Sequence, residues 1–157
     1  MTRRLKRAQA AGLDYRRYVS LLLQNGRGPR AVLLRLDGEA MTLEPTAWGS
    51  LAAALSHVTG LVRIALTECR AADDMRSALD SCLDHWLATD RSGSGPDTGR
   101  VDTGEVILAA LSRLGLPPPS VFLVGIGDGD RRLAERTRLA GFFSADTYPY
   151  LPKGTPA

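Results

Sequence analysis

The residues best placed to do chemistry lie in one segment, Val121–Asp130. Its first half, Val121–Gly125, is an apolar run that predicts a buried strand, and a glycine turn and a helix pattern follow it. A strand that leads through glycines to a helix N-terminus is a common place for an anion or a metal in α/β proteins. The carboxylates of Asp128 and Asp130 therefore mark the first candidate site.

Polar side chains follow other predicted strands in the same way. Asp37 follows the first apolar run, Thr67 follows the second, and Arg100 lies after the glycine-rich loop that follows the third. The carboxyl ends of parallel strands meet at one edge of a sheet. We therefore expect these three side chains to share one crevice with Asp128 and Asp130.

The elements that must position these residues alternate along the chain. Short apolar runs predict strands, and apolar residues at three- and four-residue steps predict helices between them. This alternation predicts an α/β, three-layer, Rossmann-like fold, with a mainly parallel sheet of about five strands and helices on both faces. The predicted strands are Ala31–Leu36, Leu61–Leu66, His85–Thr89, Val121–Gly125 and Gly141–Ser144, and the predicted helices are Thr46–Val58, Asp73–Leu83, Thr103–Leu114 and Asp130–Ala140.

The two ends of the sequence differ from this α/β body, to which we assign residues 29–145. Residues 1–28 predict a basic helical lead-in that Gly12 divides and Asp14 restarts, and residues 146–157 form a proline-containing tail. Residues 1–30 contain eight Lys or Arg and one acid, a net charge of +7, so the rest of this +3 chain carries −4. Such a segment could bind nucleic acid or another polyanion, or form a solvated helix face.

Composition limits the other classes of function. No apolar run approaches the ~20 residues of a membrane span. The two cysteines, Cys69 and Cys82, lack metal-binding spacing, which favours reduced thiols and a cytoplasmic location.

The glycines of Gly125-Ile-Gly-Asp-Gly129 also permit a nucleotide-binding interpretation, as in the cofactor loops of methyltransferases and other Rossmann enzymes. In those folds the glycine loop follows the first strand, whereas here it follows a late one. The acid that would hold the ribose, about 20 residues further on, could only be Asp146 in the tail. The position of the loop therefore disfavours this alternative.

Four segments together resemble the motifs of the haloacid dehalogenase-like (HAD) phosphatase superfamily, in a small form without a large cap domain. Each segment follows the appropriate predicted strand, and the resemblance covers roughly residues 29–145. The segments are Val32–Glu39, Ile64–Thr67, Gly99–Gly104 and Val121–Asp130.

The resemblance implies roles for individual residues. Asp37 matches the acid/base aspartate, Thr67 the phosphate-binding hydroxyl, and Arg100 the basic residue of the third motif. Asp130 matches a Mg²⁺-binding acid, and Asp128 is a second candidate for that role. In the family, an aspartate attacks phosphorus while Mg²⁺ neutralises the phosphate charge.

Two departures from the family pattern carry more weight than these matches. Arg35 occupies the nucleophile position and Ile126 the position of the first fourth-motif acid, while Glu39 stands where threonine is usual. Arginine has no carboxylate and stays protonated. The aspartyl-phosphate route is therefore closed, and two Mg²⁺ ligands are missing.

Two roles are open for Arg35. It could pair with an acid at the strand ends and hold them together without metal, or it could bind an anion beside Thr67 and Arg100. The first is favoured, and its candidate partners are Asp37, Glu39 and Asp130.

Three functions follow from the sequence. The favoured one is a pseudoenzyme, a catalytically degenerate HAD-like domain that serves as a binding or structural module for a protein partner or a phosphate-containing ligand. The alternative is a Mg²⁺-dependent phosphohydrolase (hydrolase) acting on a small phosphate ester or a nucleic-acid end. The third is anion or nucleic-acid binding through residues 1–30.

Overall fold

The structure is a computed structural model that describes residues 3–38, 41–42, 45–67, 73–88, 103–125, 127–145 and 148. Within these residues, no helix is long and apolar enough to cross a membrane.

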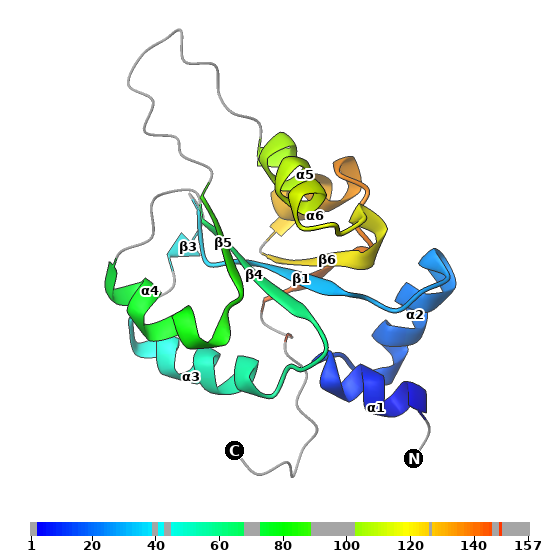
Figure 1. Cartoon of the computed structure of the whole chain (residues 1–157), viewed down its shortest axis with the longest axis horizontal. Helices are drawn as coiled ribbons and strands as arrows, with labels where there is room; N and C mark the ends of the chain where they lie inside the picture. The colour runs from blue at the N-terminus through cyan, green and yellow to red at the C-terminus, as the bar shows by residue number, and fades with distance from the viewer. Residues whose placement is uncertain are drawn as a thin grey trace, which may run out of the picture.

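A five-stranded sheet forms the centre of the molecule (Figure 1). Its order is β5-β4-β1-β6-β7, and every neighbouring pair is parallel. This confirms the predicted Rossmann-like α/β fold. The strands are β1 (Ala31–Arg35), β4 (Val62–Thr67), β5 (His85–Ala88), β6 (Val121–Gly125) and β7 (Gly141–Ser144).

Helices cover both faces of this sheet, giving three layers. Figure 1 shows α3 and α4 on one side of the sheet and α5 and α6 on the other. The helices are α1 (Arg3–Ala10), α2 (Tyr15–Asn25), α3 (Pro45–Ser56), α4 (Asp73–Leu79), α5 (Thr103–Arg113) and α6 (Gly127–Arg136), with short 3₁₀ turns η1 (Asp80–Cys82) and η2 (Pro118–Ser120).

The core is divided into two halves by the alternation of side chains along each strand. In β1, Val32 and Leu34 join the cluster under α1 to α4, while Ala31 and Leu33 join the cluster under α5 and α6. Both faces are covered, so the strands appear in the sequence as unbroken apolar runs.

The N-terminal helices pack against the first of these clusters. Asp14 caps α2 by accepting a hydrogen bond from the Arg17 N–H at 2.7 Å. Gly12 lies in the turn between α1 and α2, with φ +75°. Tyr148 covers this region from the C-terminal side, since its hydroxyl donates to the carbonyl of Ala11 at 3.0 Å and its burial raises the pKa of the phenol.

Helices α4 and α6 end earlier than predicted, at Leu79 and Arg136, and two further differences lie beside the candidate site. Helix α6 begins at Gly127 instead of Asp130, because the first turn of a helix tolerates glycine and its N-terminal dipole favours the acids Asp128 and Asp130. A short antiparallel pair, β2 (Asp37–Gly38) with β3 (Met41–Thr42), follows β1, where only a turn was expected.

Candidate functional site

The candidate site lies where the strand order reverses. From β1 the chain builds the sheet first towards β4 and β5, and then on the opposite side with β6 and β7. In open α/β sheets, the crevice beyond the carboxyl ends of two such neighbouring strands is the usual ligand site. Arg35 ends β1 and Gly125 ends β6, so both lie at this switch point, which we call the crevice.

A buried ion pair joins the two sides of the crevice. The Nε of Arg35 donates to Oδ1 of Asp130 at 2.6 Å. The side chain of Arg35 is 11% exposed to solvent and that of Asp130 is 9% exposed. The alternation along β1 explains this direction, since Arg35 continues the face of Leu33, which α6 covers. One of the partners considered from the sequence is therefore the observed one.

Gly125 makes room for the carboxylate of Asp130. A Cβ built on Gly125 would lie 2.9 Å from both Cβ and Cγ of Asp130, closer than real side chains approach. Glycine at the end of β6 thus has a steric role, and Asp130 packs on its backbone. Gly125 can be identified from the sequence, but its contact with Asp130 becomes evident only from the position of α6 in the structure.

Thr67 ends the neighbouring strand β4 and is buried. Its hydroxyl donates to the carbonyl of Leu87 on β5 at 3.3 Å. The alternation along β4 puts it on the face of Ala65, opposite to the face on which Arg35 lies. The hydroxyl predicted to bind phosphate therefore has a partner on the strand furthest from α6.

The two other acids of the candidate site are placed differently from each other. Asp128 is exposed in the first turn of α6, whereas Asp130 is buried there. Asp37 pairs through its backbone with Thr42, and its side chain lies outside the described part of the structure. Three further predicted positions, Glu39, Arg100 and Ile126, lie outside the described residues.

The described residues gather no group of three or more His, Cys, Asp or Glu that could hold a metal ion. Among the residues that the structure describes, the crevice presents the guanidinium of Arg35 and the carboxylate of Asp130, which form an ion pair. Such a pair can fix the end of β1 against the N-terminus of α6.

Comparisons with known proteins add a similarity of fold. No protein-family model matches the sequence, and no curated protein matches it. A similar solved structure comes from Legionella pneumophila, of a protein assigned provisionally to the HAD superfamily (subfamily III A) of hydrolases, at 14% identity and a TM-score of 0.47. The match covers 75% of this chain and 66% of that one, just under two thirds of its length. Similarity at this level carries no information on activity.

Proposed function

We propose that this chain is a HAD-like pseudoenzyme, whose crevice is closed by an ion pair and serves as a structural or binding module. The observation that carries the proposal is the 2.6 Å contact between Arg35 and Asp130 at the switch point of the sheet. In the motif resemblance, these two residues take the positions of the nucleophile and of a metal-binding acid.

The chemistry of arginine supports the loss of catalysis. Covalent phosphoryl transfer in this family begins with a carboxylate oxygen attacking phosphorus, and a guanidinium has no such oxygen. A guanidinium also offers no lone pair that could attack phosphorus. Asp37, in the acid/base position, has no phosphorylated partner on which to act.

Mg²⁺ does not fit the residues that are described here. A divalent cation at Oδ1 of Asp130 would compete for that oxygen with the guanidinium of Arg35, whose Nε lies 2.6 Å from it, and two cations beside one carboxylate oxygen repel each other. Mg²⁺ also requires several oxygen ligands, and the nearest described acid on α6, Asp128, is exposed to solvent. We therefore assign the role of the cation to Arg35.

In such a module, the Arg35–Asp130 ion pair would have a structural role. A buried ion pair adds little net stability over apolar packing, but removing one partner is costly. The Arg35–Asp130 pair thus fixes the register between β1 and α6. We propose that the module binds a protein partner or a phosphate-containing ligand at this end of the sheet.

A phosphatase assay tests this proposal against the alternative of an active phosphohydrolase. Wild-type protein and an Asp37→Asn variant are incubated with p-nitrophenyl phosphate, with and without Mg²⁺. We expect both proteins to release nitrophenol at the buffer rate. A Mg²⁺-dependent turnover that Asp37→Asn abolishes would contradict the pseudoenzyme proposal and favour the hydrolase.

A further inference from the structure

A second charged surface lies at the opposite edge of the sheet, where the strands begin. Seven cationic side chains of α1, α2 and the turn before β1 are exposed, and among the described residues none of them pairs with a carboxylate. The single acid of this segment, Asp14, is occupied by capping α2 and by Arg17. The seven are Arg3, Arg4, Lys6, Arg7, Arg16, Arg27 and Arg30.

Part of this surface is concave. One hollow of about 350 Å³ is lined by Arg7, Tyr18 and Thr59, and a second of about 590 Å³ is lined by Arg30 and His85. Gly60 and Leu61 line both hollows, so the two are adjacent, and we call them together the groove.

Backbone contacts fix this groove at the amino ends of the strands. The N–H of Arg30 donates to Ser120 at 2.7 Å, and its carbonyl accepts from Val62 at 3.0 Å, which places Arg30 between β6 and β4. The N–H of Thr59 donates to Ala10 at 2.7 Å and joins the end of α1 to the loop before β4. The groove is thus built of ordered backbone and lies away from the Arg35 crevice.

Of the described residues that line the groove, Asp84 is the one with a carboxylate, and a neighbouring arginine offsets its charge. Asp84 accepts the backbone N–H of Arg63 at 2.8 Å, and its Oδ2 lies 3.4 Å from Nε of the same residue. The net charge of the groove is therefore set by Arg7 and Arg30.

The chemistry of the surface favours one class of polyanion. A membrane-binding basic helix needs a free apolar face, but Ala8, Ala11 and Leu13 around the end of α1 are buried in the core. Phosphates suit arginine, whose planar fork binds two oxygens at once. Tyr15 is 46% exposed, one helical turn before Tyr18 of the groove, and exposed aromatic rings stack on unpaired bases.

We infer that α1, the start of α2 and the turn before β1 bind a single-stranded nucleic acid, with Arg7 and Arg30 holding its phosphates along the groove and Tyr15 stacking on a base. The binding is largely independent of sequence and sensitive to salt.

Fluorescence anisotropy with labelled oligothymidylate tests this inference. A strand of about 20 nucleotides covers more than one binding site of typical length. We expect wild-type protein to bind it, with affinity falling steeply between about 50 and 200 mM salt. Arg7→Gln/Arg30→Gln should weaken binding about tenfold and reduce the salt slope by about 1.4, since each single-strand phosphate contact contributes about 0.7. Tyr15→Ala should weaken binding with the slope unchanged.

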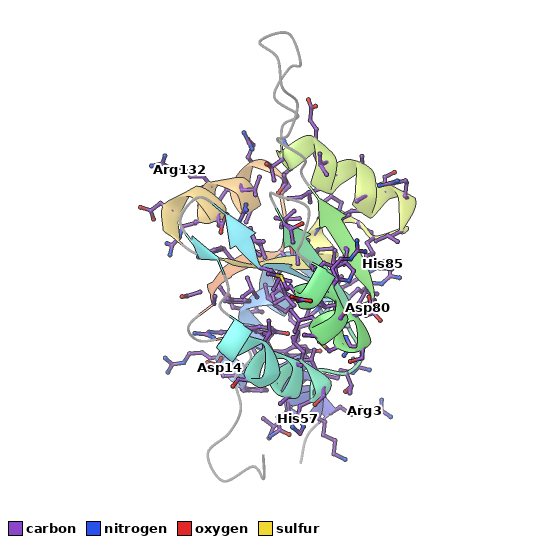
Figure 2. The ribbon with its side chains drawn as sticks, turned by 90° about the vertical axis from the view of Figure 1, so that its left-hand side faces the viewer. Arg3, Asp14, His57, Asp80, His85 and Arg132 are labelled. Atoms are coloured by element: carbon purple, nitrogen blue, oxygen red, sulfur yellow. The ribbon has the colours of Figure 1, made fainter. Side chains whose placement is uncertain are left out.

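The matched control removes two exposed arginines elsewhere, in Arg132→Gln/Arg138→Gln. Figure 2 shows Arg132 at the opposite end of the view from Arg3 of α1. This control should bind like wild type, and circular dichroism should show that every variant is folded. Three results would each overturn the inference: no salt-dependent binding by wild type, equal loss in the control, or equal binding of polyglutamate or of anionic vesicles in place of the oligonucleotide.

Discussion

Replacing Arg35 by glutamine tests the energetic part of the account. The variant leaves the carboxylate of Asp130 buried without its cation, because the two side chains retain only 11% and 9% exposure. Breaking a buried ion pair from one side costs about 3–5 kcal/mol, against a total stability of about 5–15 kcal/mol for a domain. With an m-value of about 2 kcal/mol/M, the midpoint of urea unfolding should fall by about 2 M.

The partner variant separates the pair from other contacts of Arg35. A double-mutant cycle with Asp130→Asn should give a coupling free energy of about 2 kcal/mol, since directly interacting residues are not additive. The matched control is Asp84→Asn, at the more exposed pair with Arg63, whose side chains are 42% and 20% exposed. That substitution should cost about 0–1 kcal/mol. If Arg35→Gln costs no more than Asp84→Asn, the reasoning about a buried pair is refuted.

Further predictions concern the residues that support the crevice and the N-terminal helices. Gly125→Ala should lower the free energy of unfolding by about 2 kcal/mol, because its Cβ would lie 2.9 Å from Cγ of Asp130, whereas Gly129→Ala, with nothing within 4 Å, should be neutral or stabilising in urea titrations. Asp14→Ala should cost about 1 kcal/mol, measured in the same way, because α2 loses its cap. Burial raises the pKa of Tyr148 above its ordinary value of 10.0, so its contribution to stability is present below that pH and is lost as pH rises further. Tyr148→Phe should therefore flatten the alkaline fall in thermal unfolding temperature, and an unchanged fall would contradict the assignment.

The sequence predicted the elements well, because apolar runs and helix steps reflect burial directly. The strand β1 could be recognised from Ala31 to Leu34 since both of its faces are covered. The start of α6 is harder to predict, since Gly127 and Gly129 have low helix propensity and are typical of a turn. The helix dipole favours Asp128 and Asp130 in the first turn of α6, and this effect outweighs the low helix propensity of the two glycines.

The site itself was only partly predictable. The unusual Arg35 was visible from the motif comparison, but its partner lies 95 residues away in the sequence. Asp37 and Glu39 lie closer to Arg35 in the sequence. Asp130 can be identified as the partner of Arg35 only from the strand order, which brings β6 and α6 beside β1. The placement of Thr67 on the opposite face from Arg35 likewise depends on the register of β1 with β4, which pairs Arg35 with Leu66.

The most direct test of the central claim, that Arg35 has replaced the metal, is a calorimetric titration with Mg²⁺. The account predicts no saturable heat for wild-type protein. It predicts binding only for Arg35→Asp, where two neighbouring carboxylates would attract a divalent cation and Mg²⁺ would raise the unfolding temperature. Saturable Mg²⁺ binding by wild-type protein that Asp130→Asn abolishes would contradict the account.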